Sequence, residues 1–177
     1  TEAATKVAVA MGLPVGMNVL TYDAYADQAS MTNTEKEAAL AVQQANNKIM
    51  TVVNTFAAVA DGSGMSATAS FDLAMGSIAD VVKAKVTAGT VLSFTTDMAA
   101  IVSAVEDDLE TYAAANTSLN ISVTDFKAIM VEAKKAVDNV VVKIDAFDIT
   151  TSDADKAAVV STIKTVVDEV KAVAVSV

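Results

Sequence analysis

Apolar residues recur along most of this chain at intervals of three and four, the spacing of one face of an α-helix. The clearest case is the segment from about Asn33 to Ala60. Its predicted inward face comprises Ala38, Ala41, Ala45, Ile49, Val52, Val53, Phe56 and Ala60. On the opposite face we expect the polar residues Gln43, Asn47, Thr51 and Asn54. This segment is therefore predicted to be a long amphipathic helix with one buried side.

Start and stop signals divide the chain into six predicted helices. The helix over Asn33–Ala60 is preceded by a capping-box pattern, either Thr32 with Glu35 or Thr34 with Glu37, and ends at Asp61-Gly62-Ser63-Gly64. Gly12 is placed where a left-handed residue can end the first helix, and Gly89 is predicted to end the third. Four of the other five helices are predicted over about Glu2–Met11, Ser66 or Ser70 to Val86, Thr95–Ala115 and Ser122–Ala146. The last is predicted to begin after Thr151-Ser152-Asp153 and to run to about Val175.

The four longer helices of this second group also have predicted inward faces. In chain order these comprise Phe71, Ile78, Val81, Val82 and Val86; Met98, Ile101, Val102, Val105, Leu109 and Tyr112; Phe126, Ile129, Met130, Ala133, Val137, Val140, Val141 and Ile144; and Ala157, Val160, Ile163, Val167, Val170 and Ala174. The stretch from Leu13 to Thr32 has no such period. We expect it to be an irregular loop whose apolar residues pack on the body of the domain.

Valine runs at 140–142 and 166–167 would suit β-strands locally, but charges at helical intervals through both segments favour helix. We therefore predict an all-α fold: an antiparallel helical bundle of about four long helices, with a short N-terminal helix and an ordered loop. No long polar linker divides the chain, so residues 1–177 are predicted to form one domain. The missing initiator Met suggests a module or processed piece of a larger exported protein.

Composition explains the hydropathy without a membrane span. Of the 177 residues 53% are apolar, and 35 Ala and 28 Val make up more than a third of the chain. The longest stretch without a formal charge, Val7 to Tyr22, contains Gly12, Pro14 and Gly16, and it falls short of the roughly 20 apolar residues that cross a bilayer. Small apolar residues spread over many short stripes are typical of closely packed helices.

The residue types that are missing exclude much chemistry. The chain has no Cys, His, Trp or Arg, and its net charge is −10. Thiol and imidazole catalysis, disulfides and His/Cys metal sites are therefore excluded, and an acidic chain without Arg is a poor partner for nucleic acid. We predict a protein that is not an enzyme, with no cofactor and with no residue assigned to a catalytic, cofactor or metal site.

The best candidate for a ligand is a run of oxygen-bearing residues before the last helix: Asp145, Asp148, Thr150, Thr151, Ser152, Asp153 and Asp155. Calcium binds such oxygen ligands, but the spacing, glycine and terminal glutamate of an EF-hand are absent. Asp153 has a simpler role as an acidic residue in the first turn of a helix. Calcium binding is therefore possible but is assigned to no residue.

Other polar clusters have ordinary structural explanations. The acidic run Glu106, Asp107, Asp108 and Glu110 spans little more than one helical turn and is expected to be a solvated face. Asp23 and Asp27 could form a ligand pair, but turns at these residues are favoured. We expect exposed cations at Lys83, Lys85, Lys134 and Lys135. We expect packing residues at the eight methionines, which are Met11, Met17, Met31, Met50, Met65, Met75, Met98 and Met130.

The segment from Val7 to Asp23, followed by the Ala-rich stretch at 37–46, resembles segments of very large, acidic, secreted bacterial proteins of the RTX and adhesin-like type. Asp61-Gly62 and the segment 92–97 match turns that follow in those proteins. The resemblance implies a helical module of an exported surface protein with a role in adhesion or assembly and calcium-rich neighbouring domains. Their glycine-rich nonapeptide calcium repeat is absent here, so the resemblance places calcium on no residue of this chain.

Two functions follow as expectations. The first is a structural or interaction module of an extracellular bacterial surface, adhesin or filament/matrix protein, acting through helix-face contacts with copies of itself or with neighbouring domains. The high apolar fraction favours it, because a subunit with an interface to bury needs such residues. The alternative is a binding module for an apolar or lipid-like small ligand held between helices.

Overall fold

The chain folds into helices and connecting loops. The computed structural model describes residues 2–25 and 30–175, and within these ranges there is no β-strand. The described α-helices are α1 (Glu2–Ala10), α2 (Asn33–Gly62), α3 (Ala67–Ala88), α4 (Met98–Ala115), α5 (Val123–Asp145) and α6 (Asp153–Val175), and a 3₁₀ turn, η2 (Thr117–Leu119), joins α4 to α5. The prediction of an all-α fold is confirmed.

The helix ends follow signals present in the sequence. At the start of α2 the Thr32 side chain accepts the backbone N–H of Glu35, and the Glu35 carboxylate accepts the backbone N–H of Thr32, so the first of the two possible capping boxes is formed. Gly12 has a φ of 70° after α1, and Gly89 a φ of 66° after α3. Both glycines therefore take the left-handed conformation, which was expected of Gly12, and Gly89 ends α3 as expected.

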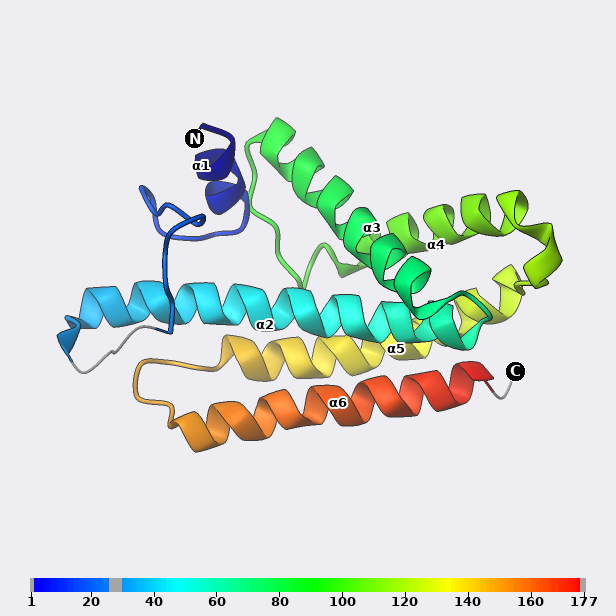
Figure 1. The fold of residues 1–177 in the computed structure, drawn as a ribbon. Helices are drawn as coiled ribbons and strands as arrows, with labels where there is room; N and C mark the ends of the chain where they lie inside the picture. Colours follow the sequence, from blue (N-terminus) through cyan, green and yellow to red (C-terminus); the bar gives the residue numbers. More distant parts are fainter. Residues whose placement is uncertain (1, 26–29, 176–177) are drawn as a thin grey trace.

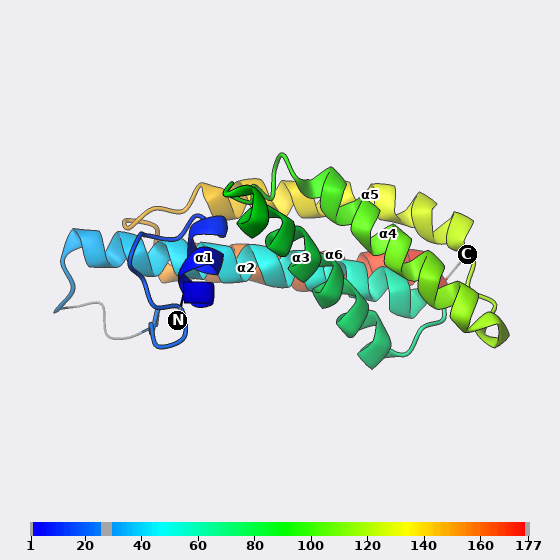
Figure 2. The same ribbon diagram turned by 90° about the horizontal axis from the view of Figure 1, so that it is seen from above.

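Three helices lie side by side through the length of the molecule (Figure 1). In the figure, α2 and α6 run in the same direction, and α5 runs opposite to both. The ion pairs agree with this order, since Lys48 of α2 contacts Asp145 at the end of α5 and Lys171 of α6 contacts Asp61 at the end of α2. Helix α3 crosses α2 obliquely, and α4 returns from α3 toward the start of α5 (Figure 2).

The finer prediction, an antiparallel bundle of about four long helices, is not confirmed. Five helices of 18 to 30 residues pack together within the described ranges, and two of them, α2 and α6, are parallel neighbours. Short α1 packs on α3. The end of α1 is also hydrogen-bonded to the loop before α4: the backbone N–H of Leu92 donates to the carbonyl of Ala10 over 2.7 Å.

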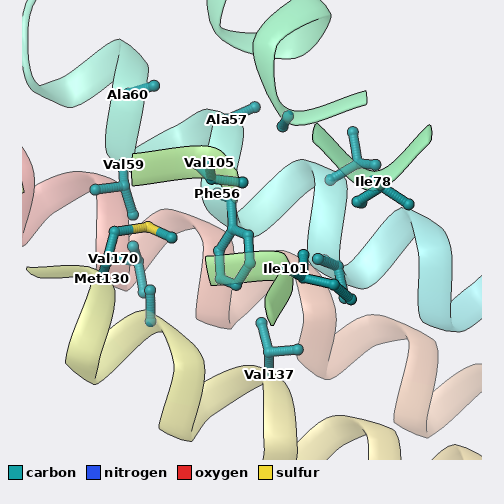
Figure 3. Close-up of a cluster of buried hydrophobic side chains, with 14 of the residues drawn as sticks. Phe56, Ala57, Val59, Ala60, Ile78, Ile101, Val105, Met130, Val137 and Val170 are labelled. Carbon is teal, nitrogen blue, oxygen red and sulfur yellow. The ribbon is translucent and has the colours of Figure 1, made fainter. Parts of the chain in front are cut away.

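The main core is formed by residues from α2 through α6. The ring of Phe56 lies among Ile101, Val105, Met130 and Val137 (Figure 3). All eight residues predicted to face inward on α5 are buried. Fully burying a Phe or an aliphatic side chain of this size contributes about 1.5–3 kcal/mol, so these contacts dominate the stability of the fold.

Several predicted faces are corrected by the structure. Thr51 was expected on the polar side of α2 but is fully buried, because its hydroxyl donates to the carbonyl of Asn47 and so needs no solvent. Phe71, Ala157 and Val160 were expected to face inward but are exposed. Their helices, α3 and α6, cover α2 from the outside and carry more apolar residues than their buried faces hold.

Helix α4 begins three residues later than predicted, at Met98 instead of Thr95. The carboxylate of Asp97 accepts the backbone N–H of Ser93 over 2.9 Å and pairs with Lys85 over 2.8 Å, so it fastens the preceding loop to α3 instead of capping α4. Leu92 and Phe94 in this loop are buried in the core. The loop is therefore part of the packed interior, which keeps residues 94–96 out of the helix.

Candidate functional site

The oxygen-rich loop between α5 and α6 uses its oxygens for local structure. One oxygen of Asp148 accepts both the backbone N–H and the hydroxyl of Thr150, at 2.7 and 2.6 Å. These hydrogen bonds, that from the hydroxyl first, hold the pKa of Asp148 below its usual value. Ser152 accepts the backbone N–H of Asp155 and donates to its carboxylate, which caps the start of α6. The loop is a connection with a well-formed helix cap.

The carboxylates of this loop do not converge on one point. Asp145 pairs with Lys48 over 2.7 Å, and Asp153 lies 3.7 Å from Lys156. Across residues 2–25 and 30–175, no three carboxylates are gathered in a way that could hold a metal ion. Asp23 accepts the backbone N–H of Tyr25 in a local turn, as favoured, whereas Asp27, the other half of that pair, lies outside the described residues.

The acidic run of α4 divides among different neighbours. Asp108 accepts the hydroxyl of Ser77 on α3, and Glu110 pairs with Lys127 on α5, which raises the pKa of Lys127 through that hydrogen bond. Glu106 is half-buried, and burial raises its pKa, an effect opposed by the charge of Lys127. The run thus partly joins α4 to α3 and to α5, and is only partly the solvated face that the spacing predicts.

The four lysines that were expected to be exposed cations are surface cations or ion-pair partners. Lys85 and Lys134 are half-buried and pair with Asp97 and Asp138, while Lys135 is exposed beside Glu132. Lys83 is exposed and has no ion pair within the described chain. Met65, Met98 and Met130 fill the core as expected, but Met50 and Met75 are exposed at 41% and 39%.

The sequence did not predict the surface groove that exposed Met75 lines. Met75 lines a groove of about 700 Å³ between α1 and α3, with the middle of α2 at its floor. We call it the α1–α3 groove. It is lined by Glu2, Ala3, Lys6, Val7, Met11, Ile49, Met75, Ile78, Ala79, Val82, Lys83 and Val86. Charged residues lie only among the side chains of α1 and at Lys83, and the remaining lining is apolar.

Met50 lines a second groove, of about 470 Å³, between α2 and α6 beside the start of α3. We call it the α2–α6 groove. Three large apolar side chains, Met50, Phe71 and Val160, are each about 40% exposed and meet there. Both grooves are open to solvent along one side and are not enclosed cavities. Each is therefore suited to an extended apolar surface more than to a fully buried small molecule.

The outer side of α3 separates the two grooves. Phe71 lines the α2–α6 groove, and Met75 and Ala79 line the α1–α3 groove. Asp72, Gly76 and Lys83 are also exposed on this helix. One signal in the sequence pointed to this surface, because the apolar residues of α3 are too many and too evenly distributed for a single buried face.

Comparison with models of protein families, with curated proteins and with solved structures finds no match to this chain. Within the part of the chain that the structure describes, no helix combines the length and the apolar character required to traverse a lipid bilayer.

Proposed function

We propose that this chain is a non-enzymatic interaction module of an extracellular bacterial surface, adhesin or filament/matrix protein, which associates with copies of itself through helix-face contacts. One observation carries the proposal: large exposed apolar side chains gather in two grooves on either side of α3. Apolar patches gathered in this way are characteristic of interaction sites, whereas single exposed apolar residues are ordinary.

The shape of the grooves supports a protein partner. Each groove is bounded by helices and open along one side, so a helix or loop of a partner has room to lie in it. Flexible Met side chains in both grooves adapt to different surfaces. The acidic, cysteine-free composition and the resemblance to secreted RTX and adhesin-like proteins support the extracellular setting.

The proposal is tested by the mass of the protein in solution over a range of concentrations, measured by sedimentation equilibrium. The unmodified chain is expected to show association that increases with concentration. The double variant Phe71→Ser/Met75→Ser removes one apolar side chain from each groove and should weaken association about tenfold or more.

The matched control is Val131→Ser/Val142→Ser on α5, since these residues are 53% and 59% exposed but line neither groove. Association of the control should equal that of the unmodified chain. A chain that is monomeric at every concentration would contradict the proposal, and so would an equal effect of the two double variants.

The alternative function, binding of an apolar or lipid-like small ligand, is favoured by one observation. The α1–α3 groove has a volume within the range of about 300–1,000 Å³ typical of ligand sites, and its lining is largely apolar. Val7 lines it from α1, whereas Val9, on the same helix and similarly exposed, does not.

Titration with a long-chain fatty acid, followed by calorimetry, tests this alternative. Val7→Trp should fill the groove and abolish binding, and Val9→Trp should leave it unchanged. Absence of heat with the unmodified chain, or equal loss in both variants, rejects the small-ligand function and leaves the proposed protein interaction unaffected.

A further inference from the structure

The outer face of α3 carries a self-complementary pattern. Asp72, Gly76, Ala79 and Lys83 recur at intervals of four, three and four, which places them in one row along the helix, and all four are exposed. The two outer residues of the row have opposite charges, and the two inner ones are the smallest side chains available. Such a row matches a second copy of itself turned end to end.

We infer that two copies of the chain pair through α3, antiparallel about a two-fold axis at the centre of this row; this inference rests on the proposed function and specifies its contact. Asp72 and Lys83 are equally distant from the centre, as are Gly76 and Ala79. In an antiparallel pair Asp72 therefore lies opposite Lys83 of the other copy, twice by symmetry, with Gly76 opposite Ala79 between them.

Charge complementarity identifies the second copy as the occupant. Among the described residues, nine of the twelve lysines form ion pairs; Lys83, like Lys36 and Lys143, forms none, and Asp72 forms none either. A surface ion pair contributes little affinity. The two pairs therefore fix the register of the dimer, while its affinity comes from apolar contact.

Gly76 provides a reason for close approach at the centre of the row. Glycine inside a helix is less favourable than Ala. A Cβ added to Gly76 would meet no atom within 4 Å, so the fold of one copy gives no packing reason for glycine there. A second helix lying against this position supplies one. On the side of α1, Met75 of each copy then packs beside Ala79 of the other.

Charge reversal tests the register. Asp72→Lys places Lys opposite Lys, and Lys83→Asp places Asp opposite Asp, so each variant alone should associate about tenfold more weakly than the unmodified chain. An equimolar mixture of the two variants restores both opposite-charge contacts. Sedimentation equilibrium should therefore show that the mixture recovers the association of the unmodified chain, and that the double variant Asp72→Lys/Lys83→Asp also retains it.

A second variant tests the close approach. Gly76→Leu should abolish association while circular dichroism and thermal unfolding show an intact helical fold, because its side chain points into open space in the single copy. If the unmodified chain associates but neither charge variant weakens it, or the mixture does not recover it, the α3 register is wrong while the proposed function stands. If the unmodified chain does not associate at all, the proposed function itself fails.

Discussion

At the scale of single residues, two glycines within helices have opposite surroundings. Gly62 ends α2 where this helix approaches α6: a Cβ there would lie against the Cβ of Ala174 and 3.2 Å from the carbonyl oxygen of Lys171. Gly76, inside α3, faces open space. The first glycine is required for the packing of α2 on α6, whereas the second is not required by the fold of one copy.

We predict that Gly62→Ala lowers the free energy of unfolding by about 1–3 kcal/mol, because α2 and α6 must separate to admit the methyl group. Gly76→Ala should raise it by up to about 1 kcal/mol through improved helix propensity. Urea unfolding of dilute protein, where association does not contribute, measures both. Equal effects of the two substitutions would show that the close approach at Gly62 is absent.

Buried hydroxyls offer a second prediction at this scale. Thr51 and Thr55 are both fully buried on α2. The Thr51 hydroxyl donates to the carbonyl of Asn47, whereas the Thr55 hydroxyl has no hydrogen-bond partner among residues 2–25 and 30–175. Thr55→Val removes an unsatisfied hydroxyl at nearly constant volume and should stabilise the protein by about 1 kcal/mol. Thr51→Val should be neutral or destabilising in the same thermal unfolding experiment. A loss of stability with Thr55→Val would indicate a partner for its hydroxyl.

At the scale of elements, the connection between α3 and α4 depends on a single carboxylate. The hydrogen bond from Lys85 and the backbone N–H of Ser93 hold the pKa of Asp97 below its usual value near 3.8. A carboxylate with a lowered pKa in the folded protein stabilises it above the pKa of the unfolded chain. That contribution is lost as the pH falls through the lower pKa of the folded state.

Asp97→Asn should therefore reduce stability at neutral pH by about 1–2 kcal/mol, the scale of hydrogen bonds to a charged group. The difference from the unmodified chain should shrink as the pH is lowered through about 4 and below. Urea unfolding at a series of pH values measures it, with Asp125→Asn on α5 as a control. A difference that is constant with pH would exclude ionisation of Asp97 as the cause.

Sequence signals predicted the helices well and their faces unevenly. Caps and glycines placed most helix ends within two residues, because these signals act locally through hydrogen bonds and backbone conformation. The face of α5 was predicted completely because its apolar and polar sides are sharply separated. Phe71 and Val160 were misassigned because α3 and α6 carry more apolar residues than one face holds, and periodicity alone does not choose among them.

The two grooves could not be predicted because they depend on how distant segments pack. The α1–α3 groove brings Val7, Ile49 and Met75 together from three helices. Lys83 was correctly expected to be exposed. The proposed pairing of Lys83 with Asp72 of a second copy could not be predicted, because it requires knowing which face of α3 is exposed. Hydrophobic periodicity also does not predict which helices are neighbours, so the side-by-side packing of α2, α5 and α6 could not be predicted.

At the scale of the whole molecule, the helices differ in how firmly they are held. The buried residues of the main core come from α2 to α6 and the connecting loops, and none comes from α1. Helix α1 is held by contacts with α3 and by the hydrogen bond from Leu92 to Ala10. Elements with few buried apolar contacts open more readily than the core.

We therefore predict that hydrogen exchange is slowest in α5 and in the second half of α2 and is at least about tenfold faster in α1. Exchange measured by mass spectrometry on the native protein checks this. Gly12→Ala, which strains the left-handed end of α1, should accelerate exchange in α1 and leave α5 unchanged. Equal acceleration in both helices would show that α1 unfolds only together with the core.

The parallel packing of α2 and α6 also affects how the protein folds. Asp61 and Lys171, which join the ends of these helices, are 110 positions apart in the chain. While a new chain is being synthesised, the side of α2 that α6 covers stays exposed until α3, α4 and α5 have all emerged. Contacts between such distant segments slow folding and leave apolar surface open to wrong partners in the meantime. Packing of α6 on α2 is therefore a late step in the folding of these helices, and the apolar surface of α2 stays exposed until it occurs.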